Sequence, residues 1–295
     1  MNGKKSRSSH LNWLQVPQLR DPYLVAGFYG WSNAGSVSTD TLRYLKEAAE
    51  PITFASLSDE GFLNYSLDRP IAHIQDGVIL DMEPPETEVA YWTNPEGDQD
   101  VILLLGKEPH VHWIEYAENV LEIATRLRVA RLYTIGGVQD TVSHLAPPVI
   151  SVVASTTGVL ESTLRFDKVI RPADYHGPVS IHSFLIKFCR EAGLEAASLW
   201  GHVPAYLQRS PRVVYKLITI LNKAVGMKCP VQILRQQSIE LDRKIGEALA
   251  KDPSLRQFVE SLEEKRSGDD ASSSDDKIIH MNDFLRRDPR KDPEE

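Results

Sequence analysis

Three places along the chain join a short apolar run to glycine-rich or polar residues, which is the pattern of a strand that ends in a loop before a helix. The runs cover residues 24–28, 132–135 and 197–200, and the segments that follow them are 30–35, 136–137 and 201–204. Open α/β sheets bind ligands where strands end and helices begin, because free backbone N–H groups point outward there. The pattern predicts the frame of a binding site, without a recognisable set of catalytic groups.

Length and composition limit the class of protein. With 295 residues, 42% of them hydrophobic, the chain can bury the core of one large domain or of one domain with an appendage. No stretch is long and apolar enough to cross a bilayer, and the basic N-terminus is followed by polar, proline-broken sequence. A net charge of -8 argues against a general nucleic-acid binder. We therefore expect a cytoplasmic protein whose partners are neither membranes nor nucleic acids.

Apolar runs alternate with helical periodicity along most of the chain. The strand-like runs cover residues 23–28, 52–57, 78–82, 89–92, 101–105, 131–135, 149–154 and 195–200. Between them, apolar residues such as Leu42 and Leu45, or Leu185 and Phe188, share one face of a helix. The alternation predicts an α/β fold with a mostly parallel sheet and helices on both faces. Asp76 and Gly77 predict a hairpin turn inserted into this plan.

Composition divides the chain into four parts. We expect an N-terminal extension over residues 1–19, an α/β domain over 20–229, a helical hairpin over 230–266 and an acidic, disordered tail over 267–295. The helical hairpin has too little apolar surface to stand alone, so it should pack on the body or on another subunit. The tail contains four apolar residues, which indicate either a partner-binding segment or a disordered tail with incidental apolar residues. They are Ile278, Met281, Phe284 and Leu285.

Four segments, taken in order, resemble a known family. They are GWSNAG at residues 30–35, GGVQDTVSHLAPP at 136–148, GPVSIHSFLIKFCREAG at 177–193 and LWGHVPAYLQRSPRVVYKL at 199–217. Together they resemble the proteasome assembly chaperone family that is named for the second of these chaperones, and its bacterial-type members. The similarity covers about residues 20–225.

This resemblance implies a single α/β domain similar in fold to purine nucleoside phosphorylases, without their active site, in a protein that forms homo-oligomers, with a trimer as the expected state. Eukaryotic members of the family guide assembly of the proteasome core particle. Archaeal relatives dock on that particle through a C-terminal tail made of a hydrophobic residue, a tyrosine and any residue. The present chain departs from this pattern, since its last residues are Pro293, Glu294 and Glu295.

The loop after residue 29 nearly matches the sharp turn that carries a nucleophilic serine in some hydrolases. The motif G-x-S-x-G would begin at Gly30 and place its serine at Ser32, but it requires glycine where Ala34 stands. Capping of the next helix by Ser32 or Asn33 is the favoured interpretation, and the same N–H groups could hold an anion or a carboxylate. The candidate ligand-binding residues are Gly30, Trp31, Ser32, Asn33, Gly136, Gly137 and His202.

Histidines and cysteines offer weaker candidates. His110 and His112 begin a helix and have no third ligand at metal-binding spacing, so a surface role is favoured over zinc. Four histidines in or beside the loops that follow strands could converge on one crevice: His144, His176, His182 and His202. Cys189 and Cys229 lack a CxxC motif and are interpreted as reduced, structural residues. We expect no metal and no cofactor.

Two functional hypotheses follow from the sequence. In the first, the protein is a non-enzymatic oligomeric scaffold or assembly-chaperone-like protein, which binds itself and an unknown protein partner. In the second, it is a small-molecule-binding protein or an enzyme that uses the loops around Ser32, Gly136 and His202. The first is preferred, because the sequence has no identifiable nucleophile, metal set or phosphate-binding loop.

Overall fold

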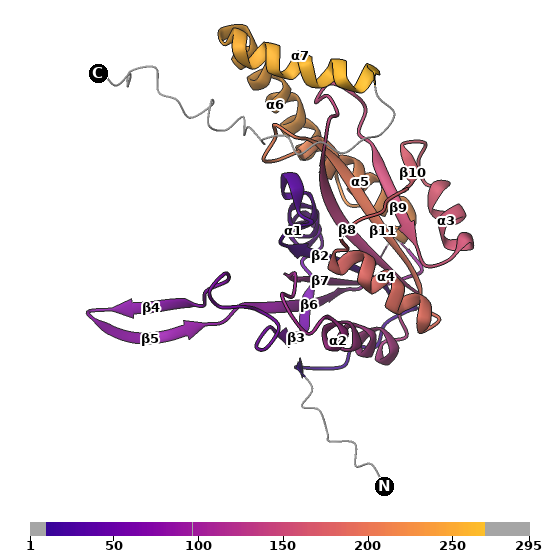
Figure 1. Cartoon of the computed structure of the whole chain (residues 1–295). Helices are drawn as coiled ribbons and strands as arrows, with labels where there is room; N and C mark the ends of the chain where they lie inside the picture. The colour runs from indigo at the N-terminus through magenta and orange to yellow at the C-terminus, as the bar shows by residue number, and fades with distance from the viewer. Residues whose placement is uncertain (1–9, 96, 269–295) are drawn as a thin grey trace.

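The computed structural model describes residues 10–95 and 97–268, and in these the fold is built on one large sheet. Its strand order is β1-β3-β6-β7-β2-β8-β11-β9-β10 (Figure 1). The strands are β1 (Leu11–Trp13), β2 (Tyr23–Tyr29), β3 (Ile52–Ser58), β6 (Glu86–Trp92), β7 (Val101–Lys107), β8 (Arg131–Asp140), β9 (Ile150–Ala154), β10 (Ile170–Pro172) and β11 (Glu195–Pro204).

The sheet is mixed, whereas the sequence predicts a mostly parallel one. Strands β7, β2, β8 and β11 pair in parallel at its centre. The pairs β1–β3, β3–β6, β6–β7 and β11–β9 are antiparallel, and β9–β10 is parallel. The short link between β6 and β7 accounts for one reversal, because only antiparallel neighbours can be joined by a few residues. The α/β class itself is confirmed.

Helices cover both faces of the sheet, as predicted. Helices α1 (Val37–Ala49) and α5 (Pro211–Val225) pack on one face, and α2 (Trp113–Arg126) and α4 (Ile181–Glu191) pack on the other. Helix α3 (Thr157–Leu164) lies beside β9 and β10. The buried residues of β2 alternate between the two cores, with Val25 in the first and Leu24 and Ala26 in the second. This two-sided burial explains why the central strands are continuous apolar runs.

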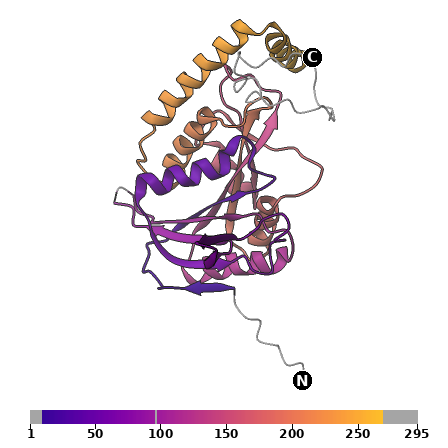
Figure 2. The same cartoon turned by 90° about the vertical axis from the view of Figure 1, so that its left-hand side faces the viewer.

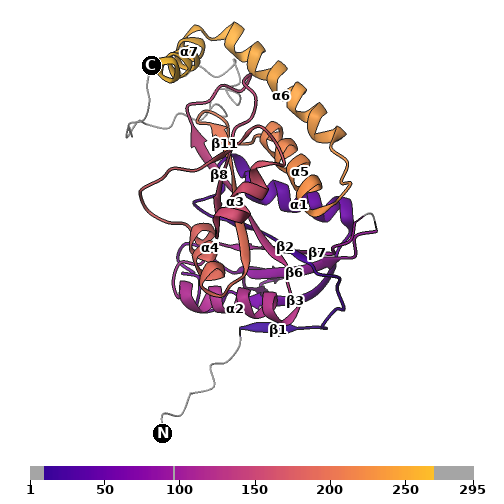
Figure 3. The ribbon, with the colours of Figure 1, turned by 90° about the vertical axis from the view of Figure 1, so that its right-hand side faces the viewer.

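The predicted helical hairpin is present and packs on the body. It consists of α6 (Gln232–Lys251) and α7 (Pro253–Gly268), and α6 runs alongside α5 (Figures 2 and 3). Leu234 and Ile245 of α6 are buried in the same core as α5, together with Leu255 and Val259 of α7. The apolar stripe of the helical hairpin is therefore satisfied within the chain. Helix α7 continues just past the expected boundary at residue 266.

A two-stranded hairpin projects away from the body (Figure 1). It is formed by β4 (Ile71–Gln75) and β5 (Val78–Glu83), and we call residues 71–83 the arm. The predicted turn is confirmed: Asp76 and Gly77 both adopt positive φ angles, 52° and 81°, which suit a two-residue hairpin turn. Every residue of both strands is exposed, so β5, predicted to belong to the sheet plan, lies outside the core.

Two further expectations meet the limits of what is described. Ile278, Met281, Phe284 and Leu285 lie outside the described residues, as does most of the expected acidic tail. Within the described part of the chain, no helix has the length and apolarity needed to span a membrane.

Candidate functional site

The loop that follows β2 lies directly against β8, at the carboxyl end of the central parallel strands. The N–H of Gly137 donates to the Ser32 carbonyl at 2.8 Å, and Asn33 and Gly137 form a short parallel bridge. A Cβ at position 137 would lie 2.3 Å from the Ala34 carbonyl oxygen, so only glycine allows this approach. The structure thus brings together Ser32, Asn33 and the glycine pair of β8.

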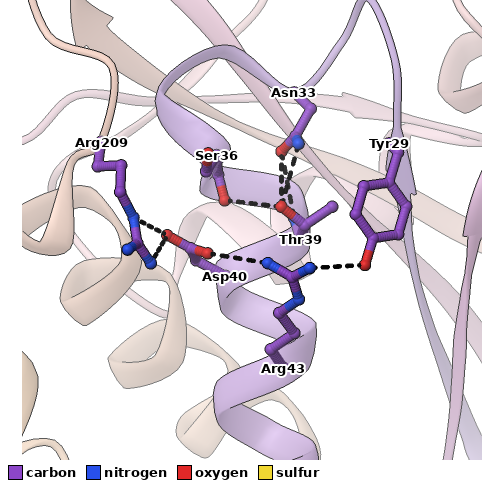
Figure 4. Close-up of polar contacts among 7 residues, drawn as sticks. All are labelled: Tyr29, Asn33, Ser36, Thr39, Asp40, Arg43 and Arg209. Carbon is purple, nitrogen blue, oxygen red and sulfur yellow. Dashed lines mark hydrogen bonds and ion pairs between the residues drawn. The ribbon is translucent and has the colours of Figure 1, made fainter.

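Asn33 caps helix α1. Its Oδ1 accepts a hydrogen bond from the Thr39 N–H at 3.1 Å, and its Nδ2 donates to Thr39 Oγ1 at 3.0 Å (Figure 4). The capping interpretation therefore holds for Asn33. Ser32 behaves differently: it is buried, and its hydroxyl has no hydrogen-bond partner among the described residues. Within the described part of the chain no general base is hydrogen-bonded to it, so the near-match to the nucleophile turn does not extend to the arrangement that activates a serine.

Charged side chains surround the first turns of α1. Asp40 accepts two hydrogen bonds from Arg209, at 3.0 and 2.8 Å, and lies 3.8 Å from Arg43 (Figure 4). Arg43 also donates to the Tyr29 hydroxyl at 3.0 Å. Both guanidinium groups are exposed, so these pairs each contribute little stability. Trp31, in the adjoining loop, is 68% exposed, so its indole does not belong to the core.

The beginning of α4 lies near the end of β7, on the face of the sheet opposite to α1. Glu108, just beyond β7, accepts a hydrogen bond from the Ile181 N–H at 2.9 Å and so caps the helix. A Cβ at position 136 would lie 2.7 Å from the Trp200 ring, so Gly136 makes room for this indole. His182 lies between Phe28, which it meets edge to face, and Trp200, whose ring is tilted against it, with ring centroids 5.2 and 5.1 Å away.

His182 is buried with no described hydrogen-bond partner for either ring nitrogen. Burial lowers its pKa to about 3, so the native state keeps it neutral while the unfolded chain takes up a proton below about pH 6.5. Stability is therefore lost as the pH falls below that value, by about 1.4 kcal/mol per pH unit.

We expect His182→Leu to remove this loss. Relative to the parent protein, the variant should gain about 2 kcal/mol more at pH 5 than at pH 8, in urea unfolding followed by circular dichroism. His176→Leu, which changes an exposed loop histidine, is the control. An equal effect of His182→Leu at both pH values would contradict the assignment.

The four loop histidines do not all meet in one crevice. His144 and His202 line the same small hollow, where His144 Nδ1 lies 2.8 Å from the Tyr206 hydroxyl and His202, on β11, is hydrogen-bonded to Asp140 and Ser151. His182 is in the core beside α4, and His176 is exposed. The possible convergence is therefore limited to two of the four.

A small hollow lies between α6, the start of α5 and the loop after β8. It encloses about 390 Å³, part of it open to solvent, and its lining includes His144, Arg212 and Asp242. Arg212 and Asp242 form an ion pair that ties α5 to α6 across the hollow. The two cysteines are apart from it, and burial raises the pKa of Cys189 to about 12 and that of Cys229 to about 11, which suits structural thiols.

The fold and its carboxyl-edge site define an α/β protein with a mixed central sheet, an inserted hairpin arm and a packed C-terminal helical hairpin. The family model of the PAC2 family matches residues 27–249, and the chain belongs to this family. The resemblance seen in the four sequence segments is thereby confirmed. No curated protein matches the chain in sequence.

Solved structures agree with the family. A proteasome-assembly chaperone homologue from Mycobacterium tuberculosis is 26% identical, with a TM-score of 0.72 over 80% of this chain and 99% of that one. A PAC2 family protein from Streptomyces avermitilis is also 26% identical, with a TM-score of 0.68 over 76% and 95% of the two chains. An archaeal proteasome activator from Pyrococcus furiosus is 17% identical and shares the fold, with a TM-score of 0.66 over 80% and 97%.

Proposed function

We propose that this chain is a chaperone-like protein of the cytoplasm that acts through protein–protein contacts as a homo-oligomer. Two findings support the proposal. The family is PAC2, and a structural relative that covers most of this chain is a proteasome-assembly chaperone homologue. The observation that carries the proposal is the exposed arm, because an exposed apolar surface of this kind marks a site of protein–protein contact.

The arm has one apolar face. Ala72 and Ile74 are two apart on β4 and share a face, and their cross-strand partners Met82 and Ile79 lie on the same face, although a bulge interrupts β5 between them. The opposite face is mixed: it carries His73, Gln75, Asp81 and Glu83 together with Ile71 and Val78. An isolated two-stranded hairpin is marginally stable in water, and no helix or sheet among residues 10–95 and 97–268 covers this one.

We assign the apolar face of the arm to a second copy of the chain, within a trimer. The helical hairpin is not assigned to this contact, because its apolar stripe is buried on the body, which is one of the two arrangements expected from its composition. The arm is, because its apolar residues remain exposed in the single chain, and covering them in every copy requires a closed arrangement of identical contacts.

Replacing Ile74 and Ile79 together by serine should therefore dissociate the oligomer. The two side chains are 63% and 61% exposed in the single chain, and each loses roughly 1.5–3 kcal/mol of burial in the assembly. Light scattering after size exclusion, at micromolar concentration, should show three times the chain mass of 33.1 kDa for the parent protein and one chain mass for the variant.

The matched control is the double change Ile233→Ser and Ile239→Ser on α6, whose side chains are 58% and 61% exposed. It removes the same two isoleucines from a surface that is not assigned to the contact and should leave the mass unchanged. A parent protein that is monomeric at this concentration, or an arm variant that keeps the parent mass, would overturn the proposal.

A further inference from the structure

Three polar side chains from three neighbouring strands form a hydrogen-bonded row at the carboxyl end of β11. His202 Nδ1 lies 2.7 Å from Asp140 Oδ2 on β8, and His202 Nε2 lies 3.0 Å from Ser151 Oγ on β9. The sheet register explains the row. His202 is paired with Val138, two residues before Asp140, while Ser151 is paired with Trp200, two residues before His202. Residues two apart share a face, so all three side chains rise from the same face of the sheet.

The hydrogen bonds fix the protonation pattern of the row. A carboxylate can only accept, so the Nδ1–H of His202 donates to Asp140 and Nε2 carries the lone pair. That lone pair accepts the hydroxyl proton of Ser151. A serine bonded to a histidine that a carboxylate orients is the arrangement that activates serine nucleophiles, and both distances fall within the range seen for such groups.

This part of the sheet is open to solvent. Val138, the cross-strand neighbour of His202, is 38% exposed, and the His202 side chain is 21% exposed. The connecting segment 171–179 is exposed throughout. Helix α4 covers only the preceding row, where Trp200 meets His182. A ligand can therefore approach Ser151 from solvent, over the end of α4.

A hydrogen-bond donor without a partner lies beside the row. The Trp200 indole N–H is buried and has no acceptor among the described residues, and Trp200 is the register partner of Ser151. An unsatisfied buried donor is costly, and a ligand oxygen that reaches the indole N–H would satisfy it.

We propose that Ser151, His202 and Asp140 are the nucleophile, the general base and the orienting carboxylate of a site that hydrolyses carboxylic esters. Ser151 Oγ attacks the ester carbonyl carbon while its proton passes to His202 Nε2. The bond from that carbon to the leaving alcohol breaks, and His202 returns the proton to the alcohol. Water then gives a proton to His202 and attacks the acyl carbon; the bond from that carbon to Ser151 Oγ breaks, His202 returns the proton to Oγ, and the acid is released. This activity is independent of the arm and of oligomer formation.

The activity is tested on the full chain with a fluorophosphonate, which phosphonylates activated serines with loss of fluoride. We expect one adduct per chain, mapped to Ser151 by peptide mass spectrometry. Ser151→Ala should abolish it, and His202→Gln should slow its formation at least about 100-fold, the usual contribution of a general base. Asp140→Asn, which disturbs the tautomer of His202, should also slow it.

Ser66→Ala, which changes an exposed serine away from the row, should label like the parent protein. Circular dichroism melting of each variant checks that the chain is folded, and Ser151→Cys, labelled with iodoacetamide, reports access to the position if Ser151→Ala is unstable. The proposal is overturned if the parent protein gives no adduct, if the adduct lies on another residue, or if a folded His202→Gln variant labels at the parent rate.

Discussion

Gly137→Ala is expected to destabilise the protein by about 3 kcal/mol, although it adds a single methyl group. The new Cβ would lie 2.3 Å from the Ala34 carbonyl oxygen and 3.1 Å from the Ala34 nitrogen. Both contacts are backbone atoms, so no side-chain rotation can relieve them. The loop after β2 must move away from β8, which also breaks the hydrogen bond from the Gly137 N–H to Ser32. Urea unfolding measures the loss.

Gly158→Ala is the matched control, since it makes the same change at a glycine of helix α3 whose Cβ would meet nothing within 4 Å. There alanine should stabilise the protein by roughly 0.5–1 kcal/mol, because a helix favours it over glycine. If both variants changed the free energy of unfolding in the same direction and by similar amounts, the close packing of the loop on β8 would not be the reason that position 137 requires glycine.

Asp59→Asn is expected to stabilise the protein by about 2–3 kcal/mol above pH 7. Asp59 follows β3 at the base of the arm and is almost completely buried, with its Oδ1 accepting the Thr87 hydroxyl proton at 2.9 Å. Burial raises the pKa of Asp59 to about 6, even though the Thr87 hydrogen bond lowers it. In the unfolded chain this carboxyl has a pKa near 3.9.

The sign of the pH dependence follows from these two values. Between about pH 4 and 6 the native state holds a proton that the unfolded chain has released, so the parent protein loses stability as the pH rises. Asparagine is neutral throughout and can still accept from Thr87. The free-energy difference between variant and parent should therefore be small below pH 4, grow to about pH 6 and stay constant above it.

Urea unfolding of both proteins at several pH values gives this difference directly, and the titration of His182 cancels in it. Asp76→Asn, which removes an exposed carboxylate from the arm, controls for the change in net charge. A difference that is the same at pH 4 and pH 8 would show that the native state does not hold a proton on Asp59.

The positions of most strands could be predicted from sequence, but their directions could not. A continuous apolar run indicates that both faces of a strand are covered, and the central strands were predicted correctly from such runs. The same run says nothing about whether its neighbour is parallel, so the mixed sheet was missed. Strands β1 and β10 have three residues each, too few for a periodic signal.

Apolar content also gave a wrong prediction of burial where no other part of the fold packs against the apolar segment. The run in β5 looks like a core strand, yet it is exposed in the arm, while the weaker stripe of α6 is buried. Burial depends on what lies opposite in space, and that is fixed by the whole topology. The Asp76-Gly77 turn, in contrast, was predictable because the positive φ angles it needs are a local property of those two residues.

The candidate site was predicted in part. The sequence placed both the loop of Ser32 and the pair Gly136–Gly137 after strands. The structure brings them into contact, but β8 continues to Asp140, so the two glycines lie inside this strand and not in a loop. It did not indicate Asp140 or Ser151 as partners of His202, because the three belong to no motif and meet only through the register of β8, β9 and β11. The sequence signal nearest to it was that Asp140 and His202 lie in the segments that follow the predicted strands 131–135 and 195–200.

The position of β2 has a consequence for how the chain is made. This first long strand, Tyr23–Tyr29, lies at the middle of the sheet between β7 and β8, which end at residues 107 and 140. During translation it therefore emerges from the ribosome long before either neighbour exists. Helix α1 packs against α5 at residues 211–225, so its partner is synthesised later still. The central strand is synthesised early but finds its neighbours late, so the nascent chain carries an exposed apolar strand for much of its synthesis. Chaperones of the cell must then keep that strand from aggregating.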